Sequence, residues 1–276
     1  MKSIPLADGR KLDLARPLVM GIINCTPDSF AVRYETTEKA VAQARRMIDE
    51  GADIIDVGGE SSRPGSDPVP TEVELERVLP VIEKIRSISD IPVSIDTVKA
   101  VVAEKALTAG ANIVNDISAL LFDAAMSEVV VRFGCPVVLM HMKGTPKTMQ
   151  DDPYYDDVIK EIADYFEQKI EFATTRGIAE EKIILDVGIG FGKRTVDNLM
   201  LLKHLSDFKK FGRPLMIGAS RKRFIGELTG EDVDKRIDGS LAGAAMAVLN
   251  GADIIRVHEV AQTRNVVDMA AAVREV

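Results

Sequence analysis

The chain is poor in cysteine and histidine, and both shortages exclude kinds of site. Among its 276 residues there are two cysteines, Cys25 and Cys135, which stand in unrelated contexts. Two cysteines cannot make a disulfide framework or a cysteine-based zinc site, so we expect a protein of the reducing cytoplasm. The three histidines, His141, His204 and His258, are too few for a metal site built on several histidine ligands.

Long apolar stretches and an excess of positive charge are also missing. No apolar run approaches the roughly 18 residues of a membrane-spanning helix, and residues 1–21 lack the cationic and apolar regions of a signal peptide. The chain has 35 Lys and Arg against 43 Asp and Glu, a net charge of −8. This balance argues against general nucleic-acid binding but permits a local basic pocket for a small anion. We expect neither a membrane nor a nucleic acid as a partner.

One phrase occurs three times along the chain. EGADIIDV at residues 50–57 recurs as AGANIVND at 109–116 and as NGADIIRV at 250–257. Each copy follows a segment with helical periodicity and joins a glycine to an apolar run that ends near a polar residue. This pattern is typical of a helix that ends at a glycine and is followed by a buried strand.

The remaining apolar runs continue this alternation of helices and strands. Most are continuous, as expected of parallel strands buried on both faces. The expected strands lie near residues 18–24, 53–57, 92–96, 112–116, 136–140, 182–186, 214–218 and 253–257. The expected helices lie near residues 36–50, 71–89, 98–109, 123–133, 153–176, 194–207, 238–250 and 260–275. Eight such units predict an α/β fold, a single (β/α)8 TIM barrel in one domain over residues 1–276. A doubly wound sheet is the alternative, but the clear eighth strand favours closure.

Polar residues stand at the end of nearly every expected strand. In chain order they are Asn24, Asp56, Asp96, Asn115 with Asp116, His141, Asp186, the GASRKRF segment, and Arg256 with His258. In a barrel these strand ends meet at one rim, where barrel enzymes carry their chemistry. Their joint presence is a stronger signal than one polar residue, which often only caps a barrel.

The residue types at this rim predict a site with two parts. Asp96, Asn115 and Asp186 can hold a ring that is rich in N–H donors and acceptors, and Lys222 can donate to a ring carbonyl. The cationic donors suited to phosphate or pyrophosphate are Arg63, Arg256 and His258. We expect a heterocycle in the barrel mouth with an anion above it.

Other motifs do not fit their usual chemistry. In GIGFGKR three residues separate Gly188 from Gly192, and Arg194 follows the lysine, so the segment does not match a phosphate-binding P-loop. GASRK lacks the second glycine of a nucleophile elbow. Cys25 is expected to pack as a small apolar residue rather than act as a nucleophile.

Eight ordered segments resemble the dihydropteroate synthase family over almost the whole chain. They are MGIINCTPDSF, DVGGESSRPG, VSIDTVKA, NDISAL, VVLMHMKGTPKTMQ, ILDVGIGFGK, GASRKRFIG and DGSLAGAAMAVLNGADIIRVHEV. The resemblance implies a (β/α)8 barrel that forms a homodimer. It also implies a transferase of folate biosynthesis, which condenses dihydropterin pyrophosphate with p-aminobenzoate to give dihydropteroate and pyrophosphate, with Mg2+ as cofactor.

The same resemblance assigns roles to residues of the rim. The pterin-binding groups match Asp96, Asn115, Met140, Asp186, Phe191 and Lys222. The p-aminobenzoate side matches Phe30, Ser62, Pro64, Ser220 and Arg221. The pyrophosphate-binding groups match Asn24, Thr26, Arg63, Arg256 and His258, and Asn24 is also assigned to the metal. The residues expected to be catalytic are Asp96, Asp186, Lys222 and Arg256.

The chemistry implied by the resemblance is largely dissociative. Loss of pyrophosphate from the pterin's methylene carbon generates positive charge, which Asp96 and Asp186 would stabilise. Magnesium would neutralise the leaving group together with the anion-binding residues, and mobile loops would order over it. p-Aminobenzoate attacks as a neutral amine, so the reaction needs no nucleophilic residue and no strong base.

The first loop departs from the family pattern. After Phe30 the family usually continues with Ser-Asp-Gly-Gly, whereas this chain has no glycine between Phe30 and Gly51. Glycines permit the backbone swings of a mobile loop, so their absence affects the closing motion. We hypothesise that Arg33 adds an anion contact in their place. Two alternatives stay open: a pterin-dependent methyltransferase, which shares the barrel, and a non-catalytic pterin-binding protein.

Overall fold

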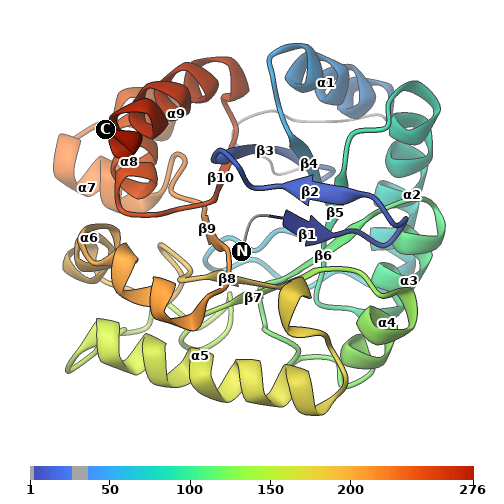
Figure 1. Cartoon of the computed structure of the whole chain (residues 1–276), viewed down its shortest axis with the longest axis horizontal. Coiled ribbons are helices and arrows are strands. Elements are labelled where there is room, and N and C mark those ends of the chain that lie inside the picture. Colours follow the sequence, from blue (N-terminus) through green and yellow to red (C-terminus); the bar gives the residue numbers. More distant parts are fainter. Residues whose placement is uncertain (1–2, 27–36) are drawn as a thin grey trace.

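The computed structural model describes residues 3–26 and 37–276, and eight parallel strands in it form a closed barrel (Figure 1). The barrel strands are β3 (Leu18–Asn24), β4 (Ile54–Gly58), β5 (Val93–Asp96), β6 (Ile113–Asp116), β7 (Val137–Met140), β8 (Ile183–Asp186), β9 (Leu215–Ile217) and β10 (Ile254–Val257). They are hydrogen-bonded in chain order, and β10 pairs with β3 to close the ring. The predicted (β/α)8 barrel is confirmed.

A ring of helices surrounds the barrel in Figure 1. The α-helices are α1 (Thr37–Asp49), α2 (Thr71–Ile88), α3 (Ala100–Thr108), α4 (Met126–Phe133), α5 (Val158–Thr175), α6 (Thr195–Lys203), α7 (Arg223–Thr229), α8 (Ile237–Leu249) and α9 (Val260–Glu275). The described residues also include the short 3-10 helices η1 (Glu180–Lys182), η2 (Leu205–Phe211) and η3 (Val233–Lys235). Within residues 3–26 and 37–276, we find no helix whose length and apolar character would let it span a membrane.

The barrel strands are apolar on both sides because each side faces a core. In β3, Val19 and Ile23 pack in the large core between the strands and the helices. Leu18 and Met20 of the same strand pack in a smaller core inside the barrel. Successive side chains of a strand point to opposite faces, so a strand between two cores is read in the sequence as a continuous apolar run.

The repeated phrase corresponds to three turns from a helix into a strand. Its glycines, Gly51, Gly110 and Gly251, have φ of +93°, +109° and +98° and follow α1, α3 and α8. A glycine adopts this conformation without the steric cost that a side chain would add. The predicted helix-to-strand turns are therefore confirmed.

A short hairpin covers the amino-terminal end of the barrel. It consists of β1 (Ser3–Pro5) and β2 (Lys11–Asp13), which pair antiparallel, and Figure 1 shows it lying across the end of the barrel nearest the viewer. Ile4 and Leu12 are buried in the inner core together with Met20. The sequence did not predict this hairpin because each strand has only three residues.

Strand register brings the polar strand ends to a common level. Asp96 is paired with Gly58 of β4 and with Asn115 of β6, and Met140 is paired with Asp186. The carboxyl ends of parallel barrel strands share one rim, so these side chains gather at the same mouth.

Candidate active site

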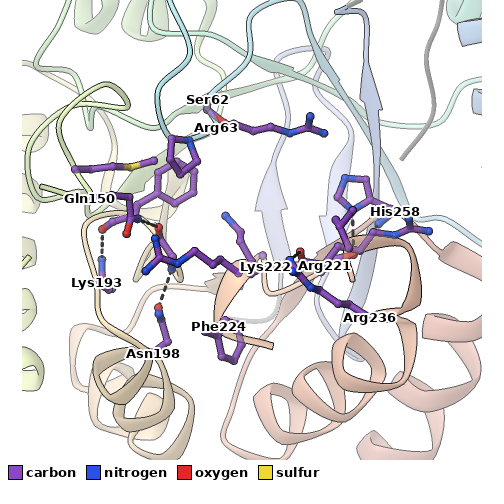
Figure 2. Close-up of a pocket in the computed structure, with 18 of the residues that line it drawn as sticks. Ser62, Arg63, Gln150, Lys193, Asn198, Arg221, Lys222, Phe224, Arg236 and His258 are labelled. Atoms are coloured by element: carbon purple, nitrogen blue, oxygen red, sulfur yellow. Dashed lines mark hydrogen bonds between the residues drawn. The ribbon is translucent and has the colours of Figure 1, made fainter. Parts of the chain in front are cut away.

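The carboxyl-terminal rim of the barrel surrounds a cavity of about 420 Å³, a volume typical of small-molecule sites. Its walls come from the ends of barrel strands and from the loops that follow them. Figure 2 shows Ser62 and Arg63 along one edge, Phe224 and Arg236 along the opposite edge, and Lys222 between them. The cavity lies where the sequence predicts a site.

Arg256, near the end of β10, lies between two carboxylates. Its Nε donates to Asp56 Oδ2 and its Nη2 donates to Asp96 Oδ2, both at 2.6 Å. Asn115 Nδ2 also donates to Asp56 Oδ2, at 3.3 Å. Asp56 Oδ1 is buried and has no hydrogen-bond partner among the described residues. In this structure the guanidinium predicted to bind pyrophosphate is therefore engaged with the protein's own carboxylates.

Burial shifts the protonation equilibria of the two carboxyls predicted to face the pterin. It raises the pKa of Asp96 to about 7, although the charge of Arg256 acts in the opposite direction. It also raises the pKa of Asp186, although the N–H of Gly188 donates to Asp186 Oδ1 at 2.8 Å and favours the charged form. Such buried carboxylates can accept hydrogen bonds from ring N–H groups and stabilise positive charge that develops beside them.

Lys222 lies over the ring of Phe191, with Nζ 4.0 Å from the ring centroid. Burial lowers the pKa of Lys222 to about 8, and the charge of Arg256 acts in the same direction. An ammonium in this position gains attraction from the ring face and keeps its N–H donors for a ligand.

A second, smaller cavity of about 20 Å³ shares part of its wall with the larger one. Its lining includes five of the six residues assigned to the pterin, namely Asn115, Met140, Asp186, Phe191 and Lys222. The sixth, Asp96, is joined to this wall through its ion pair with Arg256, which lines both cavities. The structure thus brings the predicted pterin residues together.

The loop after β9 and the end of β10 form another side of the larger cavity. Ser220 Oγ lies 2.9 Å from His258 Nδ1, and Arg221 Nε donates to Glu259 Oε1 at 2.7 Å. Burial and the charge of Arg256 lower the pKa of His258 to about 3. At neutral pH this ring is uncharged in the present structure, whereas the sequence predicted a cationic donor. It can give an anion one hydrogen bond rather than a positive charge.

Residues 62–64 line the cavity from the loop after β4. A mostly buried ion network anchors the base of this loop, because Lys99 Nζ donates to both Glu60 and Glu74. Glu60 in turn accepts from the backbone N–H of Val69 at 3.0 Å. This network ties the loop to α2 and to the segment after β5, which restricts where its side chains can lie.

The residue assigned to the metal, Asn24, lines the cavity together with Thr26. In the part of the chain that the structure describes, no three His, Cys, Asp or Glu side chains cluster as a metal cage. Magnesium commonly takes one or two protein oxygens and completes its coordination with water and substrate phosphates. The amide oxygen of Asn24, in a cavity that arginines also line, fits an ion that the substrate helps to hold.

The residues assigned to p-aminobenzoate and pyrophosphate also meet at one place. Those lining the larger cavity are Asn24, Thr26, Ser62, Arg63, Pro64, Ser220, Arg221, Arg256 and His258. Phe30 and Arg33 lie outside the described residues. The sequence marks Asp56 only as a strand end and gives no role to Lys193 or Glu259. The strand-end position of Asp56 is a signal that could have placed it in the site, whereas nothing in the local pattern identifies the other two.

Known proteins resemble the chain along nearly its whole length. Residues 20–258 match the family described as pterin binding enzyme. The dihydropteroate synthase of Escherichia coli K12 is 48% identical over 259 residues, which cover 93% of this chain and 92% of that protein. A Yersinia pestis dihydropteroate synthase in a sulfonamide drug complex matches with a TM-score of 0.94 and 44% identity, covering 97% of this chain and 98% of that chain. The Xanthomonas albilineans enzyme with 4-aminobenzoic acid matches with a TM-score of 0.91 and 44% identity, covering 99% of both chains.

Proposed function

The chain belongs to the pterin-binding enzymes and, within them, to the dihydropteroate synthases, and from this premise we propose how its rim performs the reaction of that family. It is a transferase that condenses a dihydropterin pyrophosphate with p-aminobenzoate, giving dihydropteroate and pyrophosphate. The observation that carries the assignment is the meeting of the pterin-assigned and anion-assigned residues in two adjoining cavities.

In the proposed reaction, the buried carboxyls act on the pterin ring. Asp96 and Asp186 accept from ring N–H groups and stabilise the positive charge that develops as the bond from the methylene carbon to pyrophosphate breaks. Lys222 donates to the ring carbonyl, and Asn115 both donates and accepts. Asn115 and Asp186 are buried and the Asp96 side chain is only 12% exposed, which supports this role because electrostatic interactions strengthen where water is excluded.

The leaving pyrophosphate is proposed to lie among Asn24, Thr26, Arg63 and His258, which line the larger cavity. Arg256 takes part by exchanging partners. A pterin that engages Asp96 breaks the bond of Nη2 to that carboxylate and turns one of its N–H donors to the pyrophosphate, while Asp56 Oδ2, 2.6 Å from both Nε and Nη2, keeps the guanidinium in place. Magnesium held by the Asn24 oxygen would supply further neutralisation of the leaving group's charge.

The amine acceptor is proposed to occupy the side of the cavity formed by Ser62, Pro64, Ser220 and Arg221. Its nitrogen attacks the methylene carbon as pyrophosphate departs, so the chain's task is to hold the two reactants at reacting distance. The ion pair of Arg221 with Glu259 fixes the arginine at the edge of this subsite.

Pyrophosphate release tests this function directly. The purified chain is mixed with dihydropterin pyrophosphate, p-aminobenzoate and Mg2+, and pyrophosphate and dihydropteroate are measured together. We expect both products in equal amounts, and less of both after chelation of the metal. Tight pterin binding without turnover would instead identify a non-catalytic binder. Methyl transfer from methyltetrahydrofolate to a corrinoid, without pyrophosphate release, would identify a methyltransferase.

We also propose that two copies of the chain form a homodimer through the face made by α6, α7 and α8. These helices lie next to one another in Figure 1. Their exposed apolar side chains are Val196, Leu199, Met200, Leu228, Met246 and Leu249. Exposed apolar residues gathered on neighbouring helices are typical of a surface that is covered by another subunit.

We propose a cytoplasmic location because the two cysteines are free thiols rather than a disulfide. Cys25 and Cys135 are both free and buried, and burial raises the pKa of each thiol to about 12. Thiols held in this way are unreactive packing groups, as is usual in proteins of a reducing compartment.

A further inference from the structure

Lys193 is a buried cation to which the reaction described above gives no role. It lies in the GIGFGKR segment after β8, and only 3% of its surface is exposed. Its Nζ lies 2.9 Å from His141 Nδ1, 3.3 Å from the His141 carbonyl and 3.0 Å from the Phe191 carbonyl, and Figure 2 draws Lys193 beside the cavity. An ammonium has three N–H donors, and here it meets three acceptors.

The geometry of this segment depends on a close approach to the end of β7. A Cβ built on Gly188 would lie 1.9 Å from the His141 carbonyl oxygen, and one on Gly192 would lie 2.4 Å from the Lys143 carbonyl oxygen. The two glycines therefore allow residues 188–192 to pack against the backbone after β7. Lys193 donates to a residue on each side of this contact: His141, which follows β7, and Phe191, which lies in the turn after β8.

The segment held in this way carries Phe191, the ring that lies under the Lys222 ammonium. The Phe191 carbonyl accepts from Lys193, so the buried amine contacts the backbone of the residue that carries the ring. Gln150 and Asn198 bind the same turn at the Gly190 carbonyl and N–H, at 2.9 and 2.7 Å. Only Lys193 also joins the turn to His141 among these three side chains.

We propose that Lys193 is a positioning residue for the pterin subsite: its ammonium bridges the ends of β7 and β8 and holds Phe191 where it supports Lys222. The inference deepens the proposed function, on which it rests. Lys193 acts through Phe191 and is given no contact with the reacting atoms.

The surroundings of Lys193 favour this bridge. Burial lowers its pKa to about 7, but Asp186 and Asp197 favour the charged form. Burial and the charge of Lys193 lower the pKa of His141 well below its ordinary value, so that ring is neutral. A neutral ring that accepts at Nδ1 must carry its proton on Nε2, which gives the bridge a spectroscopic signature.

The test compares Lys193→Met, which keeps most of the side-chain volume and removes the donors, with Lys105→Met on the exposed side of α3. Binding of the pterin substrate alone and steady-state kinetics with both substrates are measured. We expect Lys193→Met to weaken pterin binding and raise the pterin KM by about tenfold or more. The KM for p-aminobenzoate at saturating pterin should stay within twofold, because its subsite is built by residues that Lys193 does not touch. Lys105→Met should match the parent chain in every measurement.

Two results would overturn the proposal. The first is that the Lys193→Met variant folds and either binds pterin as tightly as the parent chain or shows an equal rise in the KM values for pterin and p-aminobenzoate. The other needs no variant: 15N spectra of histidine-labelled parent protein that place the His141 proton on Nδ1. The same spectra keep the proposal testable where Lys193→Met does not fold. If the parent chain binds pterin but releases no pyrophosphate, the proposed function fails while the binding and tautomer measurements still decide the role of Lys193.

Discussion

Asp96 and Lys222 are the single side chains on which the pterin assignment depends most. One is a buried carboxyl with its pKa raised to about 7, and the other is a buried amine with its pKa lowered to about 8. Lys222 lines the same cavity wall as Arg256, and Asp96 is ion-paired with Arg256, so replacing either removes a charged group from a site where charge develops during the reaction.

We expect Asp96→Asn and Lys222→Ala each to reduce kcat/KM by about a hundredfold or more, because each removes a stabilising charged contact in a water-poor site. Circular dichroism should show the parent fold in both variants. Lys105→Ala on α3 serves as the control for loss of an exposed lysine and should keep full activity. Near-normal turnover of either site variant would contradict the assignment to the pterin.

His258 makes stability depend on pH in a definite direction. Its pKa is lowered to about 3 in the folded chain, while an unfolded histidine titrates near 6.5. As the pH falls, the unfolded state therefore binds a proton before the folded state does. The contribution of the uncharged His258 to the free energy of unfolding is complete above about pH 6.5 and is lost as the pH falls toward 3. Asp96 acts in the opposite sense between about pH 3.8 and 7, since its folded pKa is raised.

Comparison with His258→Gln isolates the histidine from the carboxyls. The free energy of unfolding of the parent chain should fall more steeply than that of the variant, by about 1.4 kcal/mol per pH unit between pH 6 and 4. Urea unfolding at three pH values measures the difference. Parallel slopes for the two proteins would show that His258 is not kept neutral in the folded chain.

The sequence identifies the strand-end residues of the site but not their bonds to one another. Asp96 and Asp186 are predictable because they belong to a set of polar residues at the ends of nearly all the expected strands, which meet at one rim of a barrel. The pairing of Arg256 with Asp56 and Asp96 is not predictable, since it depends on side-chain directions across three strands. The role of Lys193 is not predictable either, because its acceptors include two backbone carbonyls that only the folded loops bring together.

Among the elements, the glycine turn after β8 has the tightest packing constraint in the site. Gly188 has φ of +67°, and a Cβ there would meet the His141 carbonyl at 1.9 Å. Gly212 offers a matched comparison, with φ of +64° and no atom within 4 Å of its Cβ position.

We expect Gly188→Ala to lower the free energy of unfolding by about 3 kcal/mol or more, because the backbone penalty and the clash add. Gly212→Ala should lower it by about 1 kcal/mol, the backbone penalty alone. Gly188→Ala should also lose most activity, since the turn carries Phe191. Equal effects of the two substitutions in denaturant titrations would mean that the close contact with His141 is not required.

Among the secondary-structure elements, the sequence predicts the long helices and the strands with a regular pattern but not the short elements. The eight strands and the helices between them follow from apolar runs and helical periodicity. The hairpin β1–β2 and the helix α7 were not predicted, because three-residue strands and a seven-residue helix are too short to show a period.

For the whole molecule, the apolar face on α6, α7 and α8 predicts a dimer. Leu228→Glu should place a charge in the proposed interface and convert the dimer into monomers, as measured by light scattering or sedimentation. Val101→Glu on α3 is the control, because Val101 is 50% exposed and Leu228 is 55% exposed. If both variants keep the mass of the parent protein, the interface lies elsewhere or the chain is monomeric.

Closure of the barrel by its last strand fixes the order in which the site can be completed during synthesis. Arg256 follows Asp56 by 200 residues and Asp96 by 160. At a translation rate of about 5–20 residues per second, roughly 10–40 s pass between the synthesis of Asp56 and that of its ion-pair partner Arg256. Until then the nascent sheet has open edges at β3 and β9, the strands that β10 joins, and open edges promote aggregation. We therefore expect translation of an mRNA truncated before β10 to give an aggregation-prone chain rather than an enzyme of low activity.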